Sequence, residues 1–350
     1  MRVLGTSRRG SGRPTLEEVA ARAGVGRGTA SRVINGSPRV SDTTRAAVQA
    51  AIAELGYVPN TAARALAANR TDAVALVVPE PEARFFAEPY FSDILRGIGA
   101  ELAETELQLL MVFAGNDRER RRLAQYLSAH RVDGVLLVSV HTDDTLPDLL
   151  AQLRIPTVIS GRRTGREMLP AVDADNHTGA RAAVEHLLAR GRRRIALISG
   201  RPDVYGAARR VDGYRAALRS AGHWVDDTLI VPGDFTERGG ERAMTQLLDR
   251  HPEVDAVFAA SDVMAAGARR TLRARGRRIP DDVALVGFDD SAIARHMDPP
   301  LTSVRQPVEE MGRRMVDVLL GEIAKDPRVR RHGNGPQLVL PTELVVREST

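Results

Sequence analysis

The chain has 350 residues, of which 43% are hydrophobic, and it contains no cysteine. This length allows more than one domain with a sizeable core, and the lack of cysteine excludes a disulfide scaffold or a thiolate metal site. No stretch approaches the ~18 apolar residues of a membrane span, and the start lacks the apolar run of a signal peptide. We therefore expect a cytoplasmic protein with no membrane partner.

Positive charge is concentrated at the N-terminal end. Residues 1–71 hold eleven arginines and four acids, a net charge of +7, whereas the whole chain carries +5, so the other 279 residues sum to −2. A basic module on a nearly neutral body is the expected footprint of contact with nucleic-acid phosphates. A solvated arginine-rich face would explain the arginine usage but not this asymmetry. We expect residues 1–13 to form a basic, flexible arm.

Three short helices are predicted between residues 14 and 59. Thr15-Leu16-Glu17-Glu18 is a capping box that starts the first helix, and Gly24 supplies the turn after it. A second helix, from about Arg27 to Ile34, leaves its arginines outward, as a helix that reads base edges requires. A third helix follows the Ser41 cap and ends at Gly56. This pattern is typical of a helix-turn-helix.

Beyond Thr71, short apolar runs alternate with amphipathic stretches. The expected strands are Ala73–Val78, Gln108–Phe113, Gly134–Val138, Thr157–Ser160, Arg194–Ile198, Ala256–Ala259, Ala284–Phe288 and Leu338–Leu340. The expected helices are Phe91–Glu104, Arg118–His130, Thr178–Arg190, Ala208–Ala221, Glu237–Arg250, Asp262–Arg275 and Pro307–Ile323. This alternation predicts parallel sheets covered by helices on both faces, with a cleft at the carboxyl ends of the strands.

Motifs for catalysis or metal binding are weak. The glycines between Gly24 and Gly28 are not preceded by a strand, so they do not indicate a dinucleotide loop. His177 and His186 are nine residues apart, which is not the spacing of a metal-binding pair on a helix. No Gly-x-Ser-x-Gly motif is present. We expect no enzyme activity, no catalytic residue, no metal and no cofactor beyond a small-molecule effector.

The chain resembles the lactose-repressor family of transcription regulators. The resemblance rests on Pro14–Ala20, Val25–Asn35, Val40-Ser41, Arg45, Leu55–Asn60 and Ala63-x-x-Leu66, and it extends over nearly the whole chain. It implies an N-terminal all-α helix-turn-helix head (14–59), a hinge helix (60–71) and an α/β periplasmic-binding-protein-like core (72–350).

The resemblance also implies that this core consists of two parallel-sheet subdomains between which the chain crosses three times. We place the crossings near Val172, Thr302 and Pro336. The N-subdomain would then comprise about 72–172 and 303–335. The C-subdomain would comprise about 173–302 and 336–350.

Residues in the head match positions at which family members contact operator DNA. Arg27, Gly28 and Arg32 match base-reading positions, whereas Thr29, Ser31 and Asn35 match positions on the DNA backbone. The full expected set is Thr15, Arg27, Gly28, Thr29, Ser31, Arg32, Asn35, Tyr57, Asn60, Ala63 and Leu66. Gly26 departs from the serine that is usual in the family, so its cap and phosphate contact would be lost.

The hinge segment 60–70 is expected to be disordered without DNA and helical with it. At ~11 residues it is shorter than the ~12–15 at which isolated helices become marginal in water, although its alanines favour propagation. Leu66 matches the family leucine that wedges into the minor groove.

The resemblance places a small-molecule effector in the cleft. Arg210 and Asp289 match residues that bind effector hydroxyls, and Phe235 matches an aromatic on which a ring stacks. The full expected set is Asp175, Asn176, Arg210, Phe235, Ser261, Asp262, Asp289 and Gln306. Phe235 is equally compatible with a core position, and Asp262 with a helix cap. Ser261 departs from the family's usual asparagine.

The resemblance implies a homodimeric repressor of carbohydrate-utilisation genes that binds a pseudo-palindromic operator and is released by a sugar-like effector. Two alternatives stay open: a repressor with a purine-type corepressor, and a sugar-binding protein without a regulatory role. The runs Phe86–Phe91 and Gly233–Thr236 resemble actinobacterial regulators of oligosaccharide use, β-glucosides among them.

Overall fold

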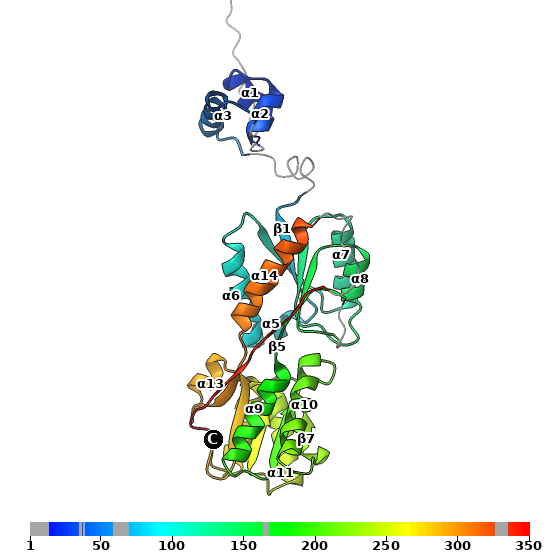
Figure 1. Cartoon of the computed structure of the whole chain (residues 1–350), viewed down its shortest axis with the longest axis vertical. Helices are drawn as coiled ribbons and strands as arrows, with labels where there is room; N and C mark the ends of the chain where they lie inside the picture. Colours follow the sequence, from blue (N-terminus) through cyan, green and yellow to red (C-terminus); the bar gives the residue numbers. More distant parts are fainter. Residues whose placement is uncertain (1–13, 35–36, 38, 59–69, 164–167, 326–334) are drawn as a thin grey trace, which may run out of the picture. The chain divides into compact units, whose positions relative to one another are not determined.

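The computed structural model describes residues 14–34, 37, 39–58, 70–163, 168–325 and 335–350 (Figure 1). The chain divides into two compact units, residues 1–71 and 72–350. The expected basic arm, nearly all of the expected hinge helix, and the expected DNA contacts Asn35, Asn60, Ala63 and Leu66 lie outside the described residues.

In its described part, the first unit consists of the helices α1 (Leu16–Arg22), α2 (Arg27–Ile34) and α3 (Asp42–Leu55). The capping box is present, because the backbone N–H of Glu18 donates to Thr15 Oγ1 and that of Thr15 to Glu18 Oε2, at 3.3 and 2.8 Å. Gly56 ends α3 in the left-handed region, at φ 61°. The buried core of this unit is Val19, Ala20, Ala30, Val33, Val48 and Ala51. The predicted three-helix head is therefore confirmed.

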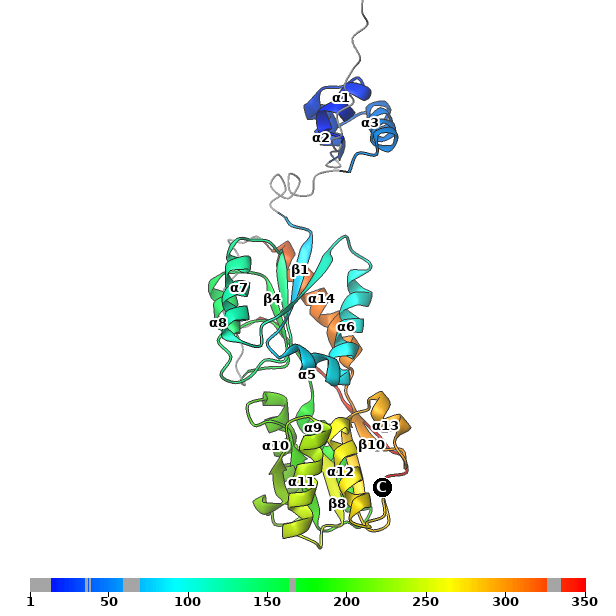
Figure 2. The same cartoon turned by 180° about the vertical axis from the view of Figure 1, so that it is seen from behind.

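The second unit contains two sheets, which Figures 1 and 2 show from opposite sides. The described strands of the first sheet, in spatial order, are β11 (Gln337–Leu340), β5 (Ala171–Ala174), β4 (Thr157–Ser160), β3 (Gly134–Leu137), β1 (Ala73–Val78) and β2 (Gln108–Phe113). All pairings in this sheet are parallel. We call it, with its helices, the N-subdomain.

The second sheet and its helices form the C-subdomain. Its described strands, in spatial order, are β12 (Glu343–Val345), β10 (Thr302–Arg305), β9 (Ala284–Asp289), β8 (Ala256–Ala259), β6 (Ile195–Ser199) and β7 (Ile230–Pro232). The edge strand β12 runs antiparallel to β10, whereas the other pairings are parallel. The predicted parallel α/β architecture is confirmed.

Helices cover both faces of each sheet (Figures 1 and 2). In the N-subdomain, α6 (Pro89–Leu102) and α14 (Val308–Ala324) pack on one face, α7 (Asp117–Ser128) and α8 (Leu146–Gln152) on the other, and α5 (Glu82–Ala87) follows β1. In the C-subdomain, α9 (Asn176–Ala189) and α10 (Tyr205–Ser220) cover one face, and α11 (Glu237–Arg250), α12 (Asp262–Ala274) and α13 (Ala292–His296) the other. A 3₁₀ turn spans Asp227–Leu229.

The strand pairing places the three crossings later than the sequence predicted. Ala171–Ala174 and Gln337–Leu340 belong to the first sheet, whereas Thr302–Arg305 belongs to the second. The chain therefore crosses after Ala174, Arg305 and Leu340 rather than near Val172, Thr302 and Pro336. The reason is that these strands hydrogen-bond to neighbours distant in sequence, which local hydrophobicity does not report.

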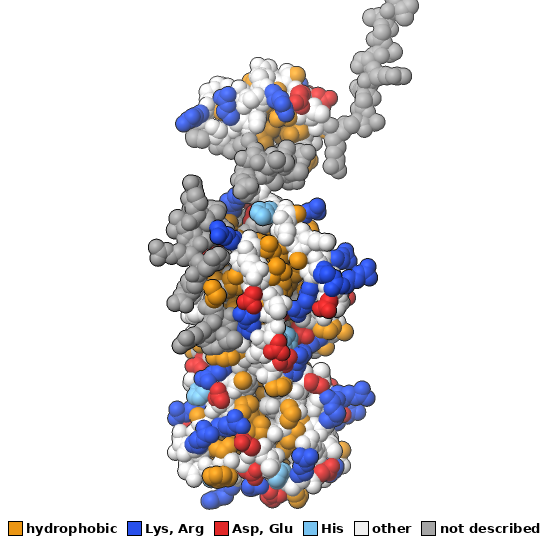
Figure 3. Space-filling model, turned by 90° about the vertical axis from the view of Figure 1, so that its right-hand side faces the viewer, with side chains coloured by type: hydrophobic (Ala, Val, Ile, Leu, Met, Phe, Trp, Pro, Cys, Tyr) orange, Lys and Arg blue, Asp and Glu red, His pale blue; other side chains and the backbone are white. Residues whose placement is uncertain are grey.

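The surface of the second unit agrees with its small net charge. In Figure 3, basic and acidic side chains are interspersed over the visible face of this unit. Among the described residues, no helix is both long and apolar enough to span a bilayer.

Candidate functional site

Helix α2 presents the arginines that the sequence assigned to base reading. The side chain of Arg27 is 71% exposed, and its Nε lies 2.8 Å from Glu17 Oε1. Such an exposed pair contributes little stability, so Glu17 holds the Arg27 side chain only weakly. Arg32 is also exposed. Gly28 leaves the surface between them open, because a Cβ there would meet only Nη2 of Arg32, at 4.0 Å.

The other expected contacts in the described head differ in exposure. Thr29 and Ser31 are half-buried on α2, and Thr15 is exposed at the cap of α1. Tyr57 packs against the three-helix core. The carbonyl of Gly26 accepts the N–H groups of Thr29 and Ala30, so Gly26 stands at the start of α2 without a side chain to cap it.

A cavity lies between the two subdomains of the second unit, with a volume of about 860 Å³ that includes its open side. This size lies in the range of small-molecule sites. Six of the eight expected effector contacts line the cavity: Asn176, Arg210, Phe235, Ser261, Asp289 and Gln306. All of them except Arg210 end a strand or follow one by one to three residues. They lie close together because parallel strands end at the same edge of a sheet.

Arg210 is held firmly on the C-subdomain side of the cavity. Its Nε donates to Asn176 Oδ1 at 2.8 Å, and its Nη1 donates to the carbonyl of Ala260. The guanidinium carbon lies 3.7 Å from the ring centroid of Phe288. Burial lowers the pKa of Arg210, and the carboxylate of Asp289 opposes this effect. The guanidinium is thus fixed in place before any ligand binds.

Asp289 provides an acceptor beside this donor. Its Oδ1 lies 3.9 Å from Nη1 of Arg210 and accepts a 2.6 Å hydrogen bond from Nε2 of Gln306. Burial raises the pKa of Asp289, and the positive charge of Arg210 partly offsets this rise. Among the residues that line the cavity, Asp289, Phe235 and Ser139 adopt positive φ angles of 113°, 65° and 58°. Such strained backbone persists mainly where surrounding structure and function hold it.

Sequence reasoning missed the N-subdomain wall of the cavity. Tyr90 and Ser160 share a 2.6 Å hydrogen bond there, and Nε of Arg162 lies 3.5 Å from Asp173 Oδ2. Burial raises the pKa of Asp173 to about 6. One signal in the sequence pointed to this wall: Asp173 is an acid inside an otherwise apolar strand.

Glu88 also belongs to the N-subdomain wall of the cavity. Burial raises the pKa of its carboxyl to about 7, although Nε of Arg84 donates to it at 2.7 Å. The guanidinium carbon of Arg84 lies 5.9 Å from the ring centroid of Phe235, which belongs to the other subdomain. Phe235 is therefore a cavity residue that also packs against the C-subdomain core.

The other two expected effector contacts, Asp175 and Asp262, are not among the residues that line the cavity. Asp175 caps α9 by accepting the N–H of Thr178 at 3.0 Å. Asp262 is fully buried at the start of α12, where its carboxylate accepts from Ser303 Oγ at 2.6 Å and from the N–H of Ser291 at 2.7 Å. Both side chains are committed to the C-subdomain.

An exposed helix-turn-helix face joined in one chain to a polar cavity between two subdomains defines a ligand-responsive DNA-binding regulator. Comparison with known families agrees. The model for bacterial regulatory proteins of the lacI family matches residues 15–60, and that for a periplasmic binding protein-like domain matches residues 184–350.

Known proteins resemble the chain over nearly its full length. It is 52% identical to the HTH-type transcriptional regulator CelR of Thermobifida fusca, over 96% of this chain and 98% of that protein. A solved CelR–cellobiose complex is 50% identical and superimposes with a TM-score of 0.76, over 97% of this chain and 100% of that one. A lac repressor dimer bound to operator and the anti-inducer ONPF is 28% identical, with a TM-score of 0.82 over 96% and 99%. The chain belongs to the lacI family and is a transcription regulator, not an enzyme.

Proposed function

We propose that the protein represses carbohydrate-utilisation genes and leaves its operator when a β-linked disaccharide of the cellobiose type fills the cavity. The juxtaposition of Arg210 and Asp289 carries this proposal. A fixed donor fork beside a fixed acceptor suits neighbouring sugar hydroxyls, which both accept and donate. Phe235 adds an apolar face against which a sugar ring can stack. The CelR–cellobiose complex, 50% identical to this chain, supports the same ligand class.

The composition of the cavity favours a sugar over a purine corepressor. Glu88, Asp173 and Asp289 bring three carboxyl groups to the cavity, and Arg84, Arg162 and Arg210 bring three guanidinium groups. This mixed set matches a ligand with hydroxyls on all sides. A flat purine needs broad stacking surfaces. The described lining has three aromatic residues, Phe235, Tyr90 and Phe91, against the six charged residues named above.

Operator binding is proposed to require two copies of the chain. One α2 reads a half-site, so a two-fold dimer fits a pseudo-palindromic operator. The edge strand β2 supports the dimer, because its apolar side chains are only partly buried and Leu110 is 37% exposed. The related lac repressor is a dimer on its operator. This function places the protein in the cytoplasm, where operator DNA lies.

Calorimetry with the full-length protein tests the ligand class directly. We expect saturable one-site binding of cellobiose and weaker binding of the monosaccharide glucose. Binding of hypoxanthine or adenosine in place of cellobiose would support the corepressor alternative. A mobility shift on genomic fragments separates a repressor from a sugar-binding protein without regulatory role, since only the repressor retards specific fragments.

A further inference from the structure

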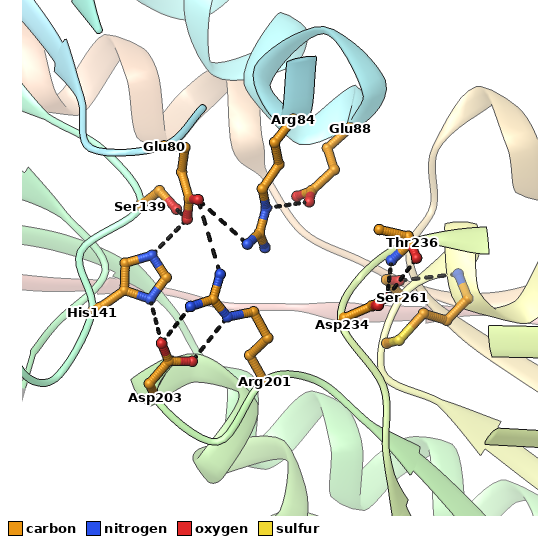
Figure 4. A network of polar contacts seen from close by, with 11 residues as sticks. Glu80, Arg84, Glu88, Ser139, His141, Arg201, Asp203, Asp234, Thr236 and Ser261 are labelled. Carbon is orange, nitrogen blue, oxygen red and sulfur yellow. Dashed lines mark hydrogen bonds and ion pairs between the residues drawn. The ribbon is translucent and has the colours of Figure 1, made fainter. Parts of the chain in front are cut away.

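A second polar network lies beside the cavity and joins the two subdomains (Figure 4). Glu80 follows β1 and His141 follows β3, so both belong to the N-subdomain. Arg201 and Asp203 follow β6 and belong to the C-subdomain. None of these four residues is part of the cavity lining. We call them the interdomain latch.

His141 sits between carboxylates from both subdomains. Its Nε2 lies 2.6 Å from Glu80 Oε1, and its Nδ1 lies 3.1 Å from Asp203 Oδ2. The backbone N–H of Thr142 also donates to the carbonyl oxygen of Asp203, at 2.9 Å. A charge contact of the imidazole and a hydrogen bond of its neighbouring peptide group thus join the loop after β6 to the N-subdomain.

Arg201 fixes Asp203 for this contact and reaches back toward the N-subdomain. Its Nη2 and Nε donate to the two oxygens of Asp203, at 2.5 and 3.0 Å, which is the bidentate geometry of a strong pair. Its Nη1 lies 4.0 Å from Glu80 Oε2. The four side chains therefore close a ring across the boundary between the subdomains.

Partial burial gives these contacts more weight than surface ion pairs have. The side chains of Glu80 and His141 are only 3% and 14% exposed. Burial raises the pKa of Glu80, but the hydrogen bond from His141 and the charge of Arg84 outweigh burial, so the pKa lies below its ordinary value. Glu80 is therefore a carboxylate at neutral pH, and opening the cleft would remove Arg201 and Asp203 from its surroundings.

Glu80 also connects the latch to the cavity wall. Nη1 of Arg84 lies 3.4 Å from Glu80 Oε2, while Nε of the same arginine donates to Glu88. Ser139 Oγ donates to Glu80 at 2.9 Å. Arg84, Glu88 and Ser139 all line the cavity, so the same carboxylate contacts both the interdomain latch and residues of one cavity wall (Figure 4).

We propose that Glu80, His141, Arg201 and Asp203 are positioning residues that hold the cleft closed before the effector arrives and thereby set effector affinity. A ligand that binds only the closed form has an apparent Kd equal to its intrinsic Kd divided by the closed fraction. Every contact that favours closure without touching the ligand raises that fraction. The predicted effect on effector affinity rests on the proposed sugar-binding function, whereas the predicted effect on cleft closure does not.

Asp203→Asn and Asp148→Asn make a matched pair of variants for the test. Each aspartate accepts a bidentate contact from one arginine of its own subdomain, since Arg163 donates to Asp148 at 2.6 and 2.9 Å. Only Asp203 also contacts the opposite subdomain. Because the chain has no cysteine, dyes can be placed at Arg121→Cys on α7 and Arg250→Cys on α11, both exposed positions.

We expect Asp203→Asn to lower energy transfer between the dyes in the absence of ligand and to weaken cellobiose binding about fivefold, with saturating cellobiose restoring the transfer. Asp148→Asn should change neither quantity. In His141→Ala, Asp203→Asn should cause little further loss, because the two residues act in one contact. Unchanged transfer in Asp203→Asn, or an equal fall in Asp148→Asn, would overturn the latch. If the wild-type protein does not bind cellobiose, the proposed ligand is wrong. The comparison of energy transfer between Asp203→Asn and Asp148→Asn without ligand then still tests the interdomain latch.

Discussion

The two units of this chain use arginine in opposite ways. On the head, the Arg27 side chain is 71% exposed and its pair with Glu17 is held only by weak surface electrostatics. In the core, the Arg210 side chain is 9% exposed, bonded to Asn176 and the Ala260 carbonyl, and stacked on Phe288. If the proposed site assignments hold, the exposed arginine is free to adapt to DNA, whereas the buried one is already fixed in place for a small ligand.

This difference predicts where each unit is sensitive to substitution. Loss of an exposed arginine removes one contact among many, so its effect is moderate and local to the DNA sequence read. Loss of the buried arginine leaves Asp289 without its nearby cation inside a low-dielectric cavity, so its effect is large. The predictions below test this contrast in order of expected size.

Arg210→Ala should abolish measurable cellobiose binding while operator binding without ligand is retained. Removing a desolvated charged donor from a binding site costs about 2–5 kcal/mol, which corresponds to a loss of at least about 30-fold in affinity. Calorimetry measures the change. Arg209→Ala is the control, since Arg209 pairs with Asp212 on the outer side of α10 and should bind cellobiose normally. An Arg210→Ala protein that binds within threefold of wild type would refute the assigned site.

Arg32→Ala should cost about 1–3 kcal/mol, concentrated at one base pair of each operator half-site, because a bidentate arginine–base contact contributes about that much. Thr29→Ala should weaken all operators evenly, as expected for a backbone contact. A series of operators with single base substitutions separates the two patterns. Identical profiles for the two variants would contradict the division between base and backbone contacts.

Glu88 should make the core unit less stable as pH rises from 6 to 8. Its folded pKa of about 7 lies above the ordinary 4.5, so between these values the folded state holds a proton that the unfolded chain has released. The free energy of unfolding should fall by about 1 kcal/mol over that interval. Urea unfolding at both pH values measures this, and Glu88→Gln should reduce the difference. The variant Glu82→Gln, at an exposed position on α5, should behave like wild type. If Glu88→Gln shows the same difference in unfolding free energy between pH 6 and pH 8 as wild type, groups other than Glu88 cause that difference.

Sequence analysis predicted best what local physical signals determine. The Thr15 capping box, the Gly56 helix end and the long amphipathic helices lie within three residues of their predicted places, because caps and apolar periodicity act over a few residues. Strands β5, β7, β10 and β12 were missed. They are three or four residues long, and β5 contains Asp173, so pairing with distant partners decides them.

The cavity could be predicted only in part for the same reason. Arg210 and Asp289 match family motifs, whereas the proximity of Glu88, Tyr90 and Arg162 to them arises only when the two subdomains face each other. The buried position of Asp262 could not be predicted from the sequence, because its partners, Ser291 and Ser303, lie 29 and 41 residues away. No short motif records such contacts.

The central claim is that the cavity of the core controls DNA binding by the head, and reciprocal titration tests it most directly. Operator affinity is measured with and without saturating cellobiose, and cellobiose affinity with and without saturating operator. Thermodynamic linkage requires both affinities to fall by the same factor, and we expect about 5–150-fold, the usual range of allosteric coupling. A factor of one in both titrations, with each ligand still bound, would show that the two units act independently and would contradict this account.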